Sequence, residues 1–593
     1  MQMNKLNKPF RPSKLALALA LITAQGAVQA YSYDHGDFSL TWDNALSYGF
    51  SVRVENRADD LVGKANHDPL VFTRPYPEQV AATGRFSVNS DDGNLLFDQG
   101  DLISNAIKWT TELGFSYGNF GGFFRASAFY DDVYANRDDL SDPVRKLVGS
   151  DLRLLDGYLY YDFDLGEMPA SIRVGNQVVN WGESAFIQGG INIINAVDVS
   201  KLRVAGAELK EALMPQNMLW GSVDITNNLS MEAVYLLEFE QIDPDPARTY
   251  FSTNDFATPG GEFVMLGFGL FDEQFPGLTI NRLPDRYPDE SGQWGVAFRY
   301  FVESLNDTEL GFFYNRYHSR LPLISGVAVR NASPSSGGYF VEYPDNIDLY
   351  GFSFNSNFDN GVAIAGEVSY RPNLPLQMDD VELLFAALSP LNAVIPEPVN
   401  RFVSQMGQYG FGQEIRGWER HKVTQAQVTI TNVFGPNNPF RADQLAVVGE
   451  FGLTQVWDLP PQENMRYNGP GTDTSGGPDV TSGRFRNPVT ETRGFATEFS
   501  WGLRTFMRMT YNNAFGTAFN LSPRIGYNID MQGVSPGPGG QFVEGRKTLS
   551  LGLNATYLEK WSADISYTRY MGAGRYNLIR DRDFASFNIK YSF

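Results

Sequence analysis

The last seven residues of the chain form a strand pattern with no later element to pair with. Residues 587–593 alternate Phe, Ile, Tyr and Phe with Asn, Lys and Ser. This period of two places the apolar side chains on one face and the polar side chains on the other. In an open sheet such a strand would leave a row of unpaired backbone groups. A closed barrel removes that edge, because the last strand pairs with the first.

The other end of the chain is typical of a secretory signal. Four basic residues between positions 5 and 14 precede an apolar run at 15–22, and the segment ends Val-Gln-Ala at 28–30. We expect residues 1–30 to be a signal peptide cleaved before Tyr31, followed by one domain over 31–593. The run is shorter than the roughly 20 residues that span a bilayer as a helix. A retained membrane anchor is the alternative.

Composition favours an envelope β protein. The chain has no Cys, which excludes disulfides and thiolate metal sites. It has 44 Phe, 29 Tyr and 9 Trp although its mean hydropathy is slightly negative. Transmembrane barrels combine aromatic girdles and an apolar belt outside with polar groups inside. A net charge of −21 argues against nucleic acid as a partner.

Alternating stretches separated by turn residues recur along the whole chain. Short turns such as 164–167 and 358–360 alternate with long loops, which is the asymmetry of outer-membrane barrels. The fold class predicted is all-β, a transmembrane antiparallel barrel of about 18 strands, with 16 as the alternative count. We expect the short turns to be periplasmic, the long loops to be extracellular and some loops to fold into the lumen. The strands are expected near 38–54, 105–117, 120–130, 151–163, 170–180, 217–225, 229–239, 293–303, 308–318, 347–357, 361–371, 419–433, 444–457, 494–512, 521–530, 549–557, 561–568 and 587–593.

The faces of the strands follow from charge. Between 495 and 511 the aromatic and apolar residues share one parity, and Arg504 and Arg508 share the other. Arg or Lys at the lipid midplane costs about 2–4 kcal/mol, so the charged parity must face the lumen. These inward charges are either ion pairs that stiffen the wall, the interpretation we favour, or an array that selects substrate. The same rule places inside Lys108, Glu112, Arg125, Asp156, Arg173, Glu232, Arg299, Glu309, Glu367, Glu450 and Lys590.

The segment 173–215 is the most distinctive in the chain. Its strand is expected to run out at a Gly182 turn, and a charged loop with a helix-compatible run at 205–214 follows. A loop this polar cannot lie in lipid. It either constricts the pore, which we favour, or caps the mouth. The candidate lumen and constriction residues are Arg173, Gln177, Trp181, Glu183, Asp198, Lys201, Arg203, Arg504 and Arg508.

Other segments bear on chemistry. Two loops carry apolar stretches, 263–271 and an amphipathic helix at 380–388, which either pack inside the protein or form a hydrophobic entrance. The four histidines have no metal spacing, and His318 has no evident Ser or Asp partner, so no catalytic residue and no cofactor is expected. The acidic run 91–101 is either a calcium site or a solvated loop, and we expect a solvated loop without metal.

Five segments of the chain resemble a Gram-negative envelope family that is known mainly as a domain of unknown function. They are the leader, the stretches 89–94 and 100–105, the motif 174–184 and the segment 197–211. The resemblance covers essentially the whole mature chain. It implies an outer-membrane barrel found near envelope transport proteins and inner-membrane exporters. A role in moving lipids or other hydrophobic compounds follows by association. It supplies no catalytic residues.

Together these observations predict an outer-membrane channel or transporter for small molecules, with hydrophobic or lipid-like compounds as the class suggested. A sealed structural or adhesive barrel is the first alternative, and an outer-membrane lipid hydrolase is the second. The expected partners are the bilayer and its lipopolysaccharide, the barrel-assembly machinery, which reads a terminal Phe of this kind, and through the resemblance periplasmic transport proteins and an inner-membrane exporter.

Overall fold

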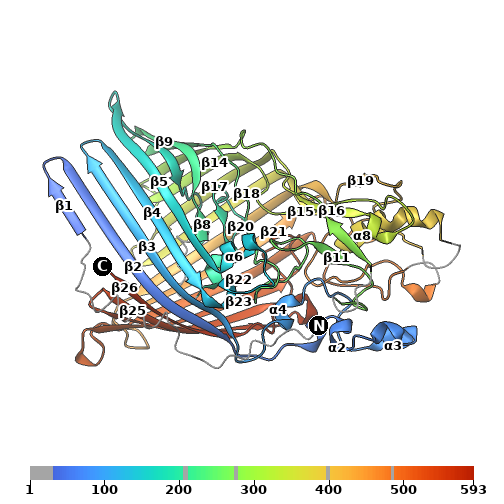
Figure 1. Ribbon diagram of the computed structural model, residues 1–593. Helices are drawn as coiled ribbons and strands as arrows, with labels where there is room; N and C mark the ends of the chain where they lie inside the picture. Colours follow the sequence, from blue (N-terminus) through green and yellow to red (C-terminus); the bar gives the residue numbers. More distant parts are fainter. Residues whose placement is uncertain (1–30, 205–211, 273–277, 396–400, 483–485) are drawn as a thin grey trace.

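The computed structural model describes residues 31–204, 212–272, 278–395, 401–482 and 486–593. The expected signal peptide and most of the helix expected at 205–214 lie outside the described residues. Within them, eighteen antiparallel strands close into one transmembrane barrel (Figure 1). The strands are β2 (Phe38–Arg53), β3 (Leu102–Tyr117), β4 (Phe120–Asp131), β5 (Ser150–Leu165), β6 (Met168–Gln177), β9 (Gln216–Thr226), β10 (Leu229–Leu236), β13 (Trp294–Val302), β14 (Thr308–Tyr317), β17 (Ile347–Asn357), β18 (Val362–Gln377), β20 (Trp418–Phe434), β21 (Gln444–Val456), β22 (Phe499–Thr510), β23 (Phe519–Gln532), β24 (Lys547–Tyr557), β25 (Trp561–Met571) and β26 (Phe584–Ser592).

The last strand closes the barrel against the first. The register of β2 and β26 runs from Ala45 opposite Ser592 to Arg53 opposite Phe584. The backbone N–H of Phe593 donates to the Asn44 carbonyl at 2.8 Å, and its own carbonyl accepts from Asn44 at 2.7 Å. The alternating terminus is therefore a closing strand, as predicted.

One strand that pairs with the barrel was missed, in addition to the short strands of the loops described below. The first strand was expected at Phe38, but β1 (Tyr31–His35) precedes it and pairs with residues 38–42 of β2. The strand β26 ends opposite Ala45, so this part of β2 would otherwise present an unpaired edge. The hairpin turns at Gly36, whose φ of +58° favours glycine.

Several strand boundaries also differ from the expectation by a few residues, and two of them affect the loops of the site. The strand β6 ends at Gln177, so Trp181 lies beyond it. The strand expected at 494–512 begins only at Phe499. Its first residues belong to the preceding loop, where the Ala496 N–H donates to the Tyr467 carbonyl at 3.0 Å instead of to a neighbouring barrel strand.

The two faces of the wall have opposite chemistry. Outward side chains are apolar and exposed, and Phe312 packs on Phe352 with ring centroids 5.4 Å apart. Inward charges form ion pairs between neighbouring strands. Arg125 contacts Glu112 at 3.0 Å and Asp156 at 2.7 Å, and Arg299 makes a similar double contact with Glu232 and Glu309. For these residues, the contacts agree with the interpretation that inward charges form ion pairs between strands of the wall.

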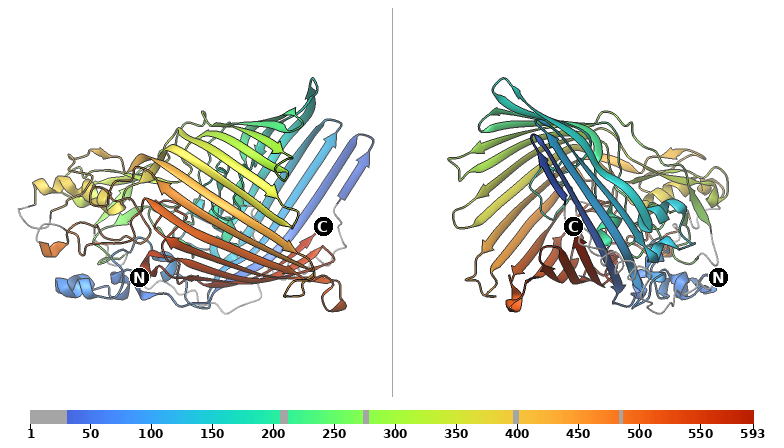
Figure 2. Two further views of the ribbon diagram at one scale, coloured as in Figure 1. Left: turned by 180° about the vertical axis from the view of Figure 1, so that it is seen from behind. Right: turned by 60° about the vertical axis from the view of Figure 1, so that its left-hand side comes forward.

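All the long loops meet at one end of the barrel, and the short turns lie at the other (Figures 1 and 2). At the loop end a small sheet joins three loops, and α8 packs on it. Among the described residues, no helix is both long and apolar enough to cross a membrane. The strands of the small sheet are β11 (Phe263–Met265), β12 (Thr279–Arg282), β16 (Gly338–Glu342), β15 (Leu323–Val327) and β19 (Glu414–Ile415), and β7 (Ala196–Val197) pairs with β8 (Leu213–Met214). The helices are α2 (Lys64–His67), α3 (Tyr76–Ala81), α4 (Asp92–Leu95), α5 (Asp132–Ala135), α6 (Asp142–Val148) and α8 (Asp380–Leu388).

Candidate functional site: a lumen strap and a loop cavity

A segment of the loop after β6 lies along the inner wall of the barrel. We call residues 182–191 the strap. At its start the buried Trp181 packs on Phe313 of β14 with ring centroids 5.9 Å apart, and further along Phe186 reaches Phe506 of β22 at 6.3 Å. The strap therefore runs from one side of the barrel interior to strands on another side.

Two inward glutamates hold the backbone of the strap. The carboxylate of Glu450 accepts the N–H groups of Ala185, Phe186 and Ile187 at 2.8–2.9 Å. The carboxylate of Glu367 accepts those of Glu183 at 2.5 Å and Ile191 at 2.9 Å. Both side chains are buried, and hydrogen bonds from backbone donors to a carboxylate are among the strong ones.

Donors from the wall satisfy the strap's carbonyl groups. The Arg371 guanidinium donates to the carbonyls of Gly189 and Gly190 at 2.6 Å each, and Gln425 donates to that of Gln188 at 2.8 Å. A Cβ on Gly190 would overlap the Glu367 carboxylate, so only glycine permits this approach. The strap is therefore fixed on both its donor and its acceptor side.

The opposite face of the strap is open. Phe186 is 41% exposed, and Ala185, Gln188 and Gly189 are exposed as well. Since these residues lie inside the barrel, the space beside them is accessible. The strap narrows the lumen at this level while leaving accessible space beside it.

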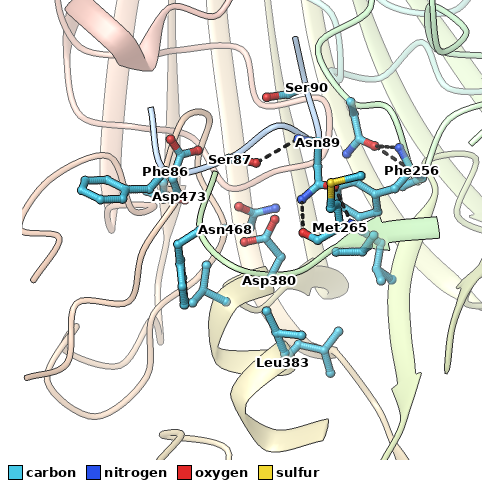
Figure 3. A pocket seen from close by; sticks show the side chains of 18 of the residues that line it. Phe86, Ser87, Asn89, Ser90, Phe256, Met265, Asp380, Leu383, Asn468 and Asp473 are labelled. Carbon is cyan, nitrogen blue, oxygen red and sulfur yellow. Dashed lines mark hydrogen bonds between the residues drawn. The ribbon is translucent and has the colours of Figure 1, made fainter. Parts of the chain in front are cut away.

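The loop end encloses a cavity of about 1040 Å³. Its wall is mainly apolar and includes Phe256, Val264, Leu266, Ile280, Leu383 and Phe385 (Figure 3). Small-molecule sites are typically concave, mostly apolar and about 300–1,000 Å³ in volume. The volume and lining are those of a binding site for an apolar or amphipathic molecule.

The two apolar loop stretches singled out in the sequence meet around this cavity. Residues 263–271 provide one wall through β11, and α8 provides another. A third loop fixes β11: the Asn89 side chain donates to the Met265 carbonyl at 3.0 Å and accepts the Met265 N–H at 2.7 Å (Figure 3). The residue before the helix α8, Asp379, is its N-cap, because its side chain accepts the Glu382 N–H at 3.2 Å.

The expectation that the acidic run at 91–101 is a solvated loop is wrong for its first part. Asp91 is 1% exposed, and its carboxylate accepts the Gly63 N–H at 2.6 Å and a hydrogen bond from the Asn66 side chain at 2.9 Å. Burial raises the pKa of Asp91, and that of Asp255 nearby, to about 7. Oxygen atoms of Asp91, Asp92 and Asp255 lie within 4.8 Å of one another.

The predicted site residues separate into two groups, the first of which lines the barrel interior. Arg173 stacks on the Trp220 ring at 4.3 Å, and the Trp181 indole N–H donates to Glu232 at 2.9 Å. Glu183 accepts from the Asn355 side chain at 2.9 Å. Gln177 is buried at the end of β6, Arg504 contacts Asp530 at 2.7 Å, and Arg508 donates to Ser522 at 3.2 Å.

The second group lies away from the strap, in packing between loops and wall. Asp198 is buried and caps the turn that contains Lys201. Lys201 donates to the Leu147 carbonyl at 2.6 Å, and burial lowers its pKa to about 8. Arg203 lies 3.6 Å from Asp245. These three charges contribute to the loop packing around α6.

Sequence reasoning missed the roles of Glu367, Glu450 and Arg371. The two glutamates were placed inside by parity, but as members of ion-pair ladders. Their partners are backbone groups of a loop about 180 and 260 residues away. The sequence feature that could have indicated these anchors is a set of polar residues at inward positions of adjacent strands: Glu367, Gln427 and Glu450.

His318, the one histidine considered for catalysis, has both ring nitrogens in contact with backbone. Its Nδ1 accepts the Asn346 N–H at 3.1 Å, and its Nε2 lies 3.0 Å from the Ser291 carbonyl. Because Nδ1 accepts, the proton of the neutral ring sits on Nε2. This arrangement holds a turn in place and offers no free base.

The sequence model of the family described as "Protein of unknown function (DUF1302)" matches residues 11–593. The chain belongs to this family. The match therefore supports the resemblance seen in the sequence over the whole described barrel. A search of curated proteins finds no match.

The solved structures similar to this chain are outer-membrane proteins, and their sequence identity to it is low. Acinetobacter baumannii OccAB1 is 9% identical with a TM-score of 0.40, over 93% of this chain and 96% of that one. Pseudomonas aeruginosa OpdK, solved with vanillate, is 8% identical with a TM-score of 0.38, over 93% and 98%. A BenF-like porin from Pseudomonas fluorescens Pf-5 is 8% identical with a TM-score of 0.37, over 93% and 98%. Resemblances this distant carry no information about cargo.

Proposed function

We propose that this protein is an outer-membrane channel for small hydrophobic or amphipathic molecules, which bind first in the loop cavity and then pass the strap. The cavity of about 1040 Å³ is the observation that carries the proposal. An apolar chamber of this size at one mouth of a barrel concentrates apolar solutes and disfavours small hydrated ones.

The wall supports the location. A closed barrel with exposed outward Phe, Leu and Ile side chains and inward ion pairs is stable in a bilayer and in no aqueous compartment. We place the loop end outside the cell and the short turns in the periplasm. The proposal includes the expected partners: lipopolysaccharide around the loops, the assembly machinery, and periplasmic transport proteins with an inner-membrane exporter.

The accessible space beside Phe186 favours a channel over a sealed structural barrel. The contacts of His318 favour a channel over a hydrolase, because both its ring nitrogens serve the backbone. We therefore propose a passive or partner-driven path without catalysis.

The test measures entry of two probes into a Gram-negative host that expresses the protein. N-phenyl-1-naphthylamine fluoresces when it reaches apolar membrane interiors, and nitrocefin reports a water-filled path through periplasmic β-lactamase. We expect faster entry of the first probe with the wild type. Leu384→Trp, which places a bulky ring in the cavity and narrows it, should reduce the gain. Val394→Trp, at a residue of the same loop that is 55% exposed and outside the cavity lining, is the matched control.

Equal naphthylamine entry with and without a folded barrel would refute the proposal. No entry of either probe would favour the sealed barrel. Faster nitrocefin entry alone would indicate a water-filled porin. Equal activity of Leu384→Trp and the wild type would show that the cavity lies off the path.

A further inference from the structure

Most charged groups that line the cavity already have partners. The Arg85 guanidinium pairs with Asp473, with one contact at 2.8 Å, and Arg546 pairs with Asp530 at 2.7 Å. Arg486 lies over the Phe402 ring at 5.0 Å. The positive charges of Arg85 and Arg546 are therefore neutralised by these aspartates.

Asp380 is different. It is the first residue of α8, directly after the capping Asp379, and its carboxylate projects into the cavity (Figure 3). One oxygen, Oδ1, is buried and has no hydrogen-bond partner. Among the described residues that line the cavity, Ser90 Oγ is the other buried oxygen in this state. A hydroxyl can donate or accept, so Asp380 is the group that discriminates between ligands.

The surroundings of Asp380 add negative charge. Asp379 precedes it, and Asp473 lies close enough to disfavour its ionisation further. Burial, the largest cause, raises the pKa of Asp380 to about 6. Arg466 neutralises Glu382 at 2.8 Å, which leaves Asp379 and Asp380 without a dedicated cation. A ligand carboxylate placed here would meet like charge.

Asp380 is partly exposed where it lines the cavity, so a rotation of its carboxylate would present the buried Oδ1 to a ligand, and a ligand that donates to it recovers the cost of the unpaired acceptor. A hydrogen bond to a carboxylate is stronger than one between neutral groups. The rest of the wall is apolar and contacts the ligand's body. The site therefore rewards a molecule with an apolar body and a donating head, and penalises the same body with an anionic head.

We propose that the cavity selects amphipathic molecules whose head donates a hydrogen bond and carries no negative charge, a hydroxyl or a protonated amine, and that Asp380 is the residue that selects them. This inference rests on the proposed function, because it names the substrate class of the same cavity.

The test is calorimetric titration of the full barrel in lipid nanodiscs, with empty nanodiscs as the reference. The probes are n-hexylamine, 1-hexanol, hexanoate and n-hexane, which share one body and differ in the head. We expect hexylamine to bind the wild type at least about tenfold more tightly than hexanoate, the factor that one charge-assisted hydrogen bond supplies. Comparison of hexanol with hexylamine tells whether a hydroxyl suffices or a cation is needed.

Three variants separate selection from folding. Asp380→Asn should weaken hexylamine binding about tenfold, strengthen hexanoate binding and leave hexane unchanged. Asp380→Glu keeps the carboxylate and should keep the preference. Asp138→Asn, at an exposed acid in another loop, is the control. Electrophoresis of heated and unheated samples checks that each variant is folded, because a folded barrel migrates differently from the heat-denatured chain.

The outcomes distinguish the two proposals. If hexane and the other probes bind equally well, and Asp380→Asn changes none of them, the head-group selection is refuted while the hydrophobic cavity stands. If a folded wild type binds no probe, including hexane, the cavity is not a ligand site and both proposals fail. Tighter binding of hexanoate than of hexylamine would reverse the assigned class.

Discussion

Replacement of Glu450 by Gln tests whether the strap is held as the contacts indicate. The carboxylate accepts three backbone N–H groups, two of them on Oε2. Gln keeps one carbonyl oxygen and turns a donor toward the remaining N–H groups, so one or two bonds are lost. At about 1.5–3 kcal/mol for a hydrogen bond to a charged group, the loss is about 3 kcal/mol. That figure corresponds to a factor of about 100 in the ratio of released to docked strap.

Two measurements follow the strap directly. The amides of residues 185–187 should exchange with solvent up to about 100-fold faster in Glu450→Gln, because release of the strap exposes them. Single-channel recording should show wider conductance states more often. Glu303→Gln, in the short turn between β13 and β14, changes the same side chain without touching the strap and is the control. Unchanged exchange at these amides in a folded variant would refute the anchoring role of Glu450.

Three further perturbations test the packing around this site. Trp181→Ala removes a ring that is 1% exposed and should cost about 3–5 kcal/mol of stability in thermal unfolding, and a change below 1 kcal/mol would contradict its buried position. Glu232→Gln weakens the acceptor shared by Arg299 and the Trp181 indole and should cost about 1–3 kcal/mol by the same measurement, whereas an unaltered melting temperature would show that the pair is incidental. Because burial raises the pKa of Asp91 and Asp255 from 3.8 to about 7, the folded loops keep protons that the unfolded chain has released, so loop stability falls as pH rises from about 4 to 7. Asp255→Asn should flatten that pH dependence of protease protection in residues 54–101, and an identical profile would refute it.

The barrel could be predicted because its determinants are local. Period-two alternation assigns each strand and each face from neighbouring residues alone, and the terminal Phe593 fixed which strand closes the sheet. The boundaries failed where a tertiary contact competes with alternation. At Ala496 a loop carbonyl takes the N–H that a longer β22 would have donated to its neighbour. At Asp91, covering loops replaced the expected solvent.

The site could be predicted only in its parts. The apolar stretches 263–271 and 380–388 were identified as needing cover, which is a local property. That they cover a shared cavity depends on the small sheet, whose β12 and β16 pair across more than 50 residues. The anchors of the strap are still more remote, since Glu450 and Phe186 are 264 positions apart. No periodicity relates such positions, so their contact follows from closure of the barrel and not from any motif.

The loop between β23 and β24 lines the cavity and also lies against the same wall glycine, Gly452, as the strap. Val543 lines the cavity, and its neighbour Phe542 is fully buried. A Cβ on Gly452 would lie 3.5 Å from the Phe542 ring and 2.5 Å from Ile187 of the strap, so both side chains rest on the same backbone. Coupling between two sites is reciprocal. Ligand in the cavity should therefore change amide exchange at 185–187 in the wild type, and Glu450→Gln, which releases the strap, should change the hexylamine affinity. If ligand alters neither quantity, Phe542 and Ile187 are neighbours without energetic connection, and passage from cavity to lumen requires no movement of the strap.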